Sequence, residues 1–242
     1  MGAVWTGPPN EVLLWTFNLD EIDSLAIASA LSQDERDRAA RFRFDIHRDR
    51  YTSARGALRT VLGALTATPP EKVEFIYGDH GKPDLKSRGV HFNLSHSDHR
   101  AIIAVTRVAP VGVDVERMNP DRANPDIARR FFAAQEIADL NGLTASEYTN
   151  AFFQCWARKE AVLKAVGTGI SGGLSSFAVP VGAMPDPIHL FSPDCWIGNL
   201  AGAFPYLESE GFSSAVCVLD HQPLIRPMCD TVLTIPVRRT FQ

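Results

Sequence analysis

The sequence predicts a mixed α and β fold in which each half of the chain places helices beside a small sheet. Segments with the alternating pattern of β-strands are interleaved with segments that have the periodicity of amphipathic helices, and this plan occurs in both halves. A chain of 242 residues, 45% of them hydrophobic, can bury a large core. We therefore expect one large domain or two small ones.

The elements of the first half follow from local patterns. Apolar residues at 12, 14 and 17 predict an early strand, and Ser32 with Glu35 has the spacing of a capping box, which begins a helix. A longer helix has its apolar stripe between Tyr51 and Leu65 and is ended by the prolines at 69 and 70. The other expectations are strands at 73–77, 92–94 and 101–105, and a turn at 78–83.

The second half has the same kinds of signal. A strand is expected at 111–115 and a short helix near Asn124. A long helix at 145–166 is predicted by the capping box of Thr144 and Glu147, by an apolar stripe that buries Trp156, and by Gly167 and Gly169 after its end. Further strands are expected near Phe177 and at 213–219.

Acidic residues in this half have the pattern of a metal site. If the valines of the 111–115 strand point into a core, Asp114 and Glu116 point together from the other face. Two adjacent carboxylates repel unless a hard divalent cation shares them. Glu160 and Lys164 emerge from one face of the long helix. Taken alone, that pair is most simply an exposed ion pair, but Glu160 could also supply a third carboxylate.

Four motifs, in order along the chain, carry a resemblance to a known family. The chain resembles the 4'-phosphopantetheinyl transferases, and specifically their longer, monomeric Sfp-type branch. The motifs are Gly81-Lys82-Pro83, Phe92-Asn93-Leu94-Ser95-His96-Ser97, Gly112-Val113-Asp114-Val115-Glu116, and Trp156-Ala157-Arg158-Lys159-Glu160-Ala161-Val162-Leu163-Lys164.

The resemblance implies a reaction and its machinery. Such an enzyme transfers the 4'-phosphopantetheine group of coenzyme A to a serine of an acyl or peptidyl carrier protein and releases 3',5'-ADP. Asp114, Glu116 and Glu160 would bind Mg2+, with Asp114, Glu160 and Lys164 as the catalytic residues. Glu160 would act as the base toward the carrier serine, and Lys164 would neutralise or protonate the leaving group.

The same resemblance assigns coenzyme A contacts. Arg50 would hold the 3'-phosphate, and Lys82, Ser95, His96 and Lys164 would contact the diphosphate. Eight arginines lie between residues 36 and 59, and such a run is more often a solvated helix face than a binding site. Arg38, Arg55 and Lys159 are weaker candidates for phosphate.

The family is a pseudodimer of two similar subdomains, each a small, mainly antiparallel sheet packed with helices, with the active site at their interface. A boundary between 109 and 110 suits that plan and gives an N-terminal subdomain at 1–109 and a C-terminal one at 110–242. Because one chain would complete the site, we expect a monomer.

Composition sets further limits. The net charge of -4 does not indicate a nucleic-acid partner, and the absence of a long apolar run or a signal-like N-terminus predicts a cytoplasmic protein with no membrane partner. The four cysteines have no paired spacing and should be free thiols.

Two other functions fit the same residues. One is a Mg2+-dependent hydrolase of coenzyme A or nucleotide diphosphates, with water as the nucleophile. The other is a coenzyme A or carrier-binding module without catalysis.

Overall fold

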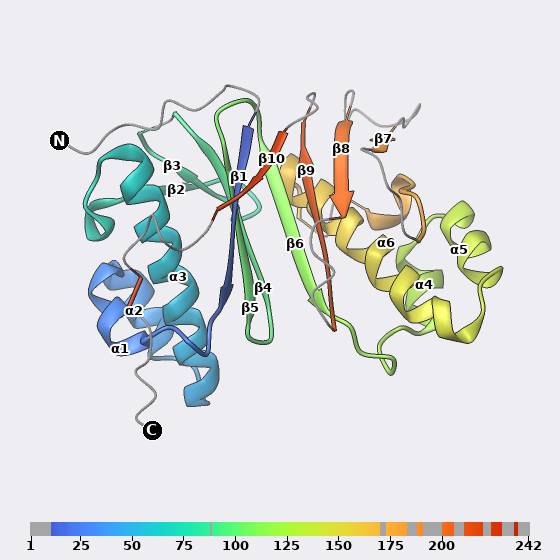
Figure 1. The fold of residues 1–242 in the computed structure, drawn as a ribbon, viewed down its shortest axis with the longest axis horizontal. Coiled ribbons are helices and arrows are strands. Elements are labelled where there is room, and N and C mark those ends of the chain that lie inside the picture. The colour runs from blue at the N-terminus through green and yellow to red at the C-terminus, as the bar shows by residue number, and fades with distance from the viewer. Residues whose placement is uncertain are drawn as a thin grey trace.

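Two four-stranded sheets lie side by side at the centre of the protein, and helices cover their outer faces (Figure 1). The computed structural model describes residues 11–87, 89–169, 173–182, 188–190, 200–205, 211–219, 224–228 and 235–236. Within these residues, no helix has both the length and the apolar character needed to cross a bilayer.

The first sheet has the order β10-β1-β5-β4, in which β1 and β4 run antiparallel to β5 while β10 runs parallel to β1. A short hairpin of β2 and β3 forms a separate two-stranded sheet. The strands are β1 (Glu11–Asn18), β2 (Phe75–Tyr77), β3 (Pro83–Leu85), β4 (His91–Ser97), β5 (Arg100–Thr106) and β10 (Leu224–Pro227).

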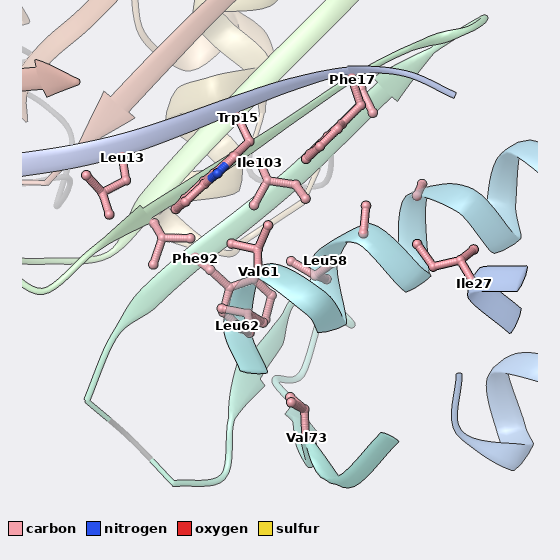
Figure 2. Close-up of a cluster of buried hydrophobic side chains, with 14 of the residues drawn as sticks. Leu13, Trp15, Phe17, Ile27, Leu58, Val61, Leu62, Val73, Phe92 and Ile103 are labelled. Atoms are coloured by element: carbon pink, nitrogen blue, oxygen red, sulfur yellow. The ribbon is translucent and has the colours of Figure 1, made fainter. Parts of the chain in front are cut away.

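Three helices accompany the first sheet: α1 (Ser24–Ile27), α2 (Gln33–Ala39) and α3 (Asp45–Thr66). Figure 2 shows how the apolar stripe of α3, with Leu58, Val61 and Leu62, faces Trp15 and Ile103 of the sheet. These five side chains are at most 1% exposed. Their burial removes a large apolar area from water and fixes α3 on the sheet.

The second sheet has the order β6-β9-β8-β7 and is antiparallel throughout. Helix α6 packs against β6 and β9, and its apolar face joins Ala215 and Cys217 of β9 in one buried cluster. The elements are β6 (Val111–Arg117), α4 (Pro125–Phe131), α5 (Ala134–Asn141), α6 (Ala145–Val166), β7 (Ile188–Leu190), β8 (Leu200–Pro205) and β9 (Phe212–Val218).

A third apolar cluster lies between the two sheets. Strand β1 contributes Val12 and Leu14, and β6 contributes Val111, Val113 and Val115, all at most 1% exposed. Because side chains alternate along a strand, the valines of β6 face this cluster while Gly112, Asp114 and Glu116 face the other side. The expected alternation in β6 is therefore confirmed.

The local signals at helix ends are confirmed as well. Thr144 and Glu147 form the capping box of α6, and Ser32 and Glu35 form that of α2. Helix α6 ends at Gly167, whose φ of 84° is in the left-handed region that glycine adopts without strain.

The strand predicted near Phe177 is wrong. A short 3-10 helix, Leu174–Ser176, precedes Phe177, and the backbone that follows bonds to side chains rather than to another strand. The Phe177 carbonyl accepts from Lys159 Nζ at 2.6 Å, and the Val179 amide donates to Glu136 Oε1 at 2.6 Å. These side chains take the place of a β-ladder partner.

Strand β10 comes from the second half of the sequence but pairs with β1, so the first sheet includes residues from both sides of the expected 109/110 boundary.

Cys155 and Cys217 are free, as expected, and both are buried. Cys195 and Cys229 lie outside the described residues.

Candidate functional site

The site is built on the face of β6 that meets helix α6. Gly112, Asp114 and Glu116 follow one another along this face, and Asp114 is only 2% exposed. At Gly112 an added Cβ would lie 2.0 Å from the Ala161 carbonyl oxygen and 2.3 Å from the Ala165 amide nitrogen. Because Gly112 has no side chain, the backbone of α6 can contact β6 two residues before Asp114.

Helix α6 brings Lys164 to Asp114 at this contact. Lys164 Nζ lies 2.6 Å from Asp114 Oδ1 and 2.9 Å from Ser95 Oγ of β4, and Ser95 Oγ donates to Asp114 Oδ1 at 3.0 Å. Among the described residues, the ion pair of Lys164 is with Asp114 on the strand. The exposed Glu160 and Lys164 pair considered from the sequence is thus not the arrangement that forms.

The three carboxylates influence one another. Burial raises the pKa of Glu116 to about 7, and the negative charges of Asp114 and Glu160 contribute to this rise. Burial, followed by the charge of Asp114, also raises the pKa of Glu160, while Lys164 opposes that shift. Both glutamates are therefore under like-charge repulsion, which a bound cation would relieve.

Buried oxygen atoms without partners fit such a cation. Asp114 Oδ2 and Glu160 Oε1 are both buried, and neither has a hydrogen-bond partner among the residues that the structure describes. Unpaired buried carboxylate oxygens are costly, and oxygen ligands are those that Mg2+ prefers. Within the described residues, no three His, Cys, Asp or Glu side chains are already gathered closely enough to form a metal cluster. The carboxylate oxygens of Asp114 and Glu160 are therefore chemically suited to Mg2+. In the described residues they are not gathered with a third ligand around one point, as the ligands of a bound ion are.

A cleft of about 770 Å³ lies beside these residues. Arg50, His96 and Ser97 line it together with Arg117 and Arg122 from the end of β6 and the loop that follows. Burial lowers the pKa of His96, and the positive charges of Lys164 and Arg50 lower it further. Of the two charges that lower the pKa of His96, that of Lys164 lies at the contact with Asp114 and that of Arg50 lies in the cleft. With its pKa below the usual value, the imidazole is largely neutral at pH 7.

Arg50 reaches the cleft from α3 but is held by carboxylates. Its Nε and Nη2 atoms each lie 2.8 Å from an oxygen of Asp20, and its Nη1 pairs with Asp98 in the β4 to β5 turn. Hydrogen bonding to Asp20 raises the pKa of Arg50. Asp98 also pairs with Arg117, so this network links α3 of the first half to β6 of the second. Asp98 was not singled out from the sequence, because its partners are distant along the chain.

Lys82 is placed differently from the other expected coenzyme A contacts. Its Nζ donates to the carbonyl oxygens of Val111 at 3.1 Å and Ala165 at 3.0 Å, and it does not line the cleft of Arg50 and His96. Burial lowers the pKa of Lys82 to about 8. Its contact with the diphosphate stays a prediction, while its observed contacts join the β2 to β3 turn to β6 and α6.

Other basic residues have structural partners. Glu35, 2% exposed, pairs with Arg55 and Arg59, and both guanidinium groups lie over the Phe75 ring. Lys159 is fully buried and donates to Glu136 Oε1 at 2.6 Å. Arg55 and Arg59 therefore belong neither to a solvated helix face nor to the cleft, because they pair with a buried carboxylate and help to assemble the first half of the chain.

Sequence reasoning missed the side chains that connect β4 to β6. Asn93 Oδ1 accepts from the Val113 amide at 2.8 Å, and Ser97 Oγ accepts from the Arg117 amide at 3.0 Å. The alternation of Asn93, Ser95 and Ser97 was the available signal, because it places three polar side chains on one face of a strand.

Comparison with known proteins places the chain in a family. The family model described as the 4'-phosphopantetheinyl transferase superfamily matches residues 110–192. The chain is 41% identical over 176 residues to 4'-phosphopantetheinyl transferase HetI of a Nostoc species, a match that covers 68% of this chain and 74% of HetI. The chain belongs to the 4'-phosphopantetheinyl transferase superfamily.

Two relatives from Bacillus subtilis extend the similarity over more of the chain. The match to 4'-phosphopantetheinyl transferase ffp has 32% identity over 205 residues, and that to 4'-phosphopantetheinyl transferase Sfp has 29% identity over 206 residues. Each covers 82% of this chain and 87% of the relative. Membership of the phosphopantetheinyl transferase superfamily, expected from the four motifs, is confirmed.

Proposed function

We propose that this protein transfers the 4'-phosphopantetheine group of coenzyme A to a serine of an acyl or peptidyl carrier protein, in a Mg2+-dependent reaction that releases 3',5'-ADP. One observation carries the proposal for this member of the superfamily. Asp114 from β6 and Glu160 from α6 each bury a carboxylate oxygen that has no partner within the described part of the chain, next to a cleft lined by Arg50 and His96.

Asp114, Glu116 and Glu160 would hold the Mg2+ ion. When bound, the ion supplies positive charge that neutralises the diphosphate and stabilises the departing phosphate. In the protein without the ion, burial and the charge of Asp114 raise the pKa of both Glu116 and Glu160, and a bound cation would relieve this repulsion.

Glu160 would accept the proton of the carrier serine, directly or through a water molecule. The serine oxygen then forms a bond to the phosphorus that bears the pantetheine group, and the bond from that phosphorus to the bridging oxygen breaks. In the protein without the ion, burial and the charge of Asp114 raise the pKa of Glu160, and a bound cation would oppose that rise. Lys164, on the same face of α6, would neutralise or protonate the departing 3',5'-ADP oxygen.

Coenzyme A would bind along the cleft. Arg50 would hold the 3'-phosphate through its planar guanidinium, and neutral His96 would donate a hydrogen bond to the diphosphate. We also assign diphosphate contacts to Ser95, Lys164 and Lys82, although Lys82 would have to leave its two carbonyl partners. The ion pairs of Arg50 with Asp20 and Asp98 hold its guanidinium at the cleft wall.

The two halves would act as a pseudodimer, with subdomains at 1–109 and 110–242 and the active site where they meet. Arg50 and His96 come from the first half, and Asp114, Glu116, Glu160 and Lys164 from the second. A single chain thus supplies every residue of the proposed site, in agreement with a monomer as the working form, which we propose acts in the cytoplasm.

Mass spectrometry of candidate apo carriers tests this function. After incubation with the protein, coenzyme A and Mg2+, we expect one phosphopantetheine group on the carrier serine and none when Mg2+ is removed with a chelator. The Glu160→Gln variant keeps the size of the side chain but lacks a carboxylate, so transfer should fall at least about 100-fold while the thermal unfolding midpoint changes little.

Two results would contradict the proposal. Release of 3',5'-ADP from coenzyme A at the same rate without a carrier would indicate a hydrolase. Coenzyme A binding without turnover, over a panel of fatty-acid, polyketide and nonribosomal-peptide carriers, would indicate a binding module. If Glu160→Gln transferred the group at the wild-type rate, Glu160 would not be the base, and the proposed transfer reaction would still stand.

A further inference from the structure

Strands β4 and β6 lie next to each other at the edges of two different sheets. Side chains of β4 satisfy the β6 amides that a neighbouring strand would otherwise bond. Val113 N donates to Asn93 Oδ1 at 2.8 Å, Val115 N to Ser95 Oγ at 3.3 Å, and Arg117 N to Ser97 Oγ at 3.0 Å. In each pair the acceptor lies 20 residues before the donor, so the contacts continue in one register along both strands.

The two serines in this register also bond to acidic side chains. A hydroxyl can accept a hydrogen bond while it donates its own hydrogen. Ser95 donates to Asp114 Oδ1 at 3.0 Å, and Ser97 donates to Glu116 Oε2 at 2.9 Å. Each hydroxyl is thus oriented by a backbone amide of β6 and directs its hydrogen to the carboxylate of the preceding residue on β6.

The two carboxylates depend on these serines to different degrees. Asp114 Oδ1 also receives Lys164 Nζ at 2.6 Å, so Asp114 has a second partner when the serine bond is lost. For Glu116, the bond from Ser97 is the one hydrogen bond recorded within the described part of the chain. Glu116 is also repelled by Asp114 and Glu160, which favours rotation of its carboxylate away from them.

We infer that Ser97 is the positioning residue that holds the Glu116 carboxylate on the face of β6 that carries Asp114, in an orientation from which it can bind the divalent cation. This inference rests on the proposed function and adds a residue to it. The Ser97 side chain connects the cation site to the cleft, because its hydroxyl bonds to Glu116 while the residue lines the cleft. Its hydrogen-bonded geometry is fixed by the backbone of β6, which makes it a rigid support.

Binding of Mn2+, used as a paramagnetic substitute for Mg2+, tests the role of Ser97 without a carrier. The free ion is counted by electron paramagnetic resonance during titration of the protein with coenzyme A present. Loss of a hydrogen bond to a metal ligand typically weakens binding, and we expect Ser97→Ala to raise the Mn2+ dissociation constant roughly 10-fold to 100-fold. The KM for coenzyme A should change little, while the Mg2+ concentration for half-maximal transfer should rise in parallel.

Two further variants separate positioning from a general loss of structure. Ser97→Thr keeps the hydroxyl on a residue that suits a strand, so it should restore most of the Mn2+ affinity. Ser53→Ala removes a buried hydroxyl in α3 for which the described residues offer no hydrogen-bond partner, and it should leave Mn2+ binding unchanged. Both should unfold at temperatures close to that of the wild-type protein.

Wild-type Mn2+ affinity in Ser97→Ala would overturn the inference, as would a rise only in the KM for coenzyme A, which would make Ser97 a direct ligand contact. A loss of Mn2+ affinity that Ser97→Thr does not restore would also overturn it. The proposed function fails separately, if the wild-type protein binds Mn2+ and coenzyme A but modifies no carrier.

Discussion

Gly112 decides how closely helix α6 can approach strand β6. An added Cβ there would lie 2.0 Å from one helix backbone atom and 2.3 Å from another, well inside any tolerated contact. Backbone atoms of a helix cannot rotate out of the way as a side chain can, so the whole helix would have to move. Because Glu160 and Lys164 lie on that helix, the position of the site depends on the absence of a side chain at Gly112.

We therefore predict that Gly112→Ala lowers both stability and transfer. Overpacking of this kind typically costs about 1 to 3 kcal/mol of unfolding free energy. A displacement of catalytic groups by about 1 Å can reduce the rate about 100-fold. Urea unfolding and the rate of carrier modification measure the two effects.

Gly142→Ala provides the matched control for Gly112→Ala. Gly142 follows α5 with φ of -79°, which alanine adopts readily, and an added Cβ would be 3.4 Å from its nearest neighbour, the Asp139 carbonyl oxygen. This variant should keep full activity and equal or exceed the wild-type stability. Full activity in Gly112→Ala would mean that the helix can shift without moving the reacting groups.

Local sequence patterns pointed to the residues of the proposed site but not to the side chains that support them. Alternation along β6 and the one-turn spacing of Glu160 and Lys164 are local patterns, so Asp114 and its neighbours could be identified without a structure. The hydroxyl of Ser97 bonds to a strand 19 and 20 residues further on, and no local rule predicts that register.

At the scale of elements, a buried ion pair fixes α6 to the structure around it. Lys159 Nζ donates to Glu136 Oε1 of α5 and to the Phe177 carbonyl, both at 2.6 Å. Glu136 also accepts from the amides of Ala133 and Val179. Lys159 and Glu136 thus connect α5, α6 and the segment that follows α6. The connection lies on the buried side of α6.

We predict that Lys159→Met is far more destabilising alone than in combination with Glu136→Gln. Removal of one partner leaves a buried charge without compensation, which costs about 3 to 5 kcal/mol of unfolding free energy. The double variant has no charge to bury and retains an amide that can bond to the same backbone groups. Chemical unfolding of the two single variants and the double variant forms a complete cycle. Simple additivity of the two losses would show that the pair is not coupled.

Elements with signals in their own sequence were predicted, and those defined by distant contacts were not. The two capping boxes mark the starts of α2 and α6, and Gly167 marks the end of α6. The region near Phe177 has the composition of a strand, but its backbone is bonded by Lys159 and Glu136, which lie 18 and 43 residues before their partners. Strand β10 pairs with β1 from the opposite end of the chain, which no periodicity reveals.

At the scale of the whole molecule, Lys82 joins the two halves of the chain. It extends from the turn between β2 and β3, and its ammonium group bonds to the carbonyl oxygens of Val111 and Ala165. Those carbonyls mark the start of β6 and the last turn of α6, so a single side chain spans the junction. Burial lowers the pKa of Lys82 to about 8 from its usual 10.5, because the charged form is poorly solvated there.

This shift predicts how stability depends on pH. Between pH 8 and 10.5 the folded protein has released the Lys82 proton while the unfolded chain still holds it, so the free energy of unfolding attributable to Lys82 increases with pH. Below pH 8 both states are protonated and the cost of burying the charge is present in full. The neutral amine still has two N–H groups for its two carbonyl partners.

Lys82→Met tests this by removing the titrating group while keeping a long side chain. Stability curves in urea from pH 7 to 10.5 should show the wild-type protein gaining free energy of unfolding relative to Lys82→Met, by roughly 3 kcal/mol at most over the window. Lys72→Met, which changes an exposed lysine, should follow the wild-type curve. A constant difference between the wild-type protein and Lys82→Met at every pH would show that Lys82 titrates normally, and its ammonium group would then be accessible to solvent rather than fixed at the junction.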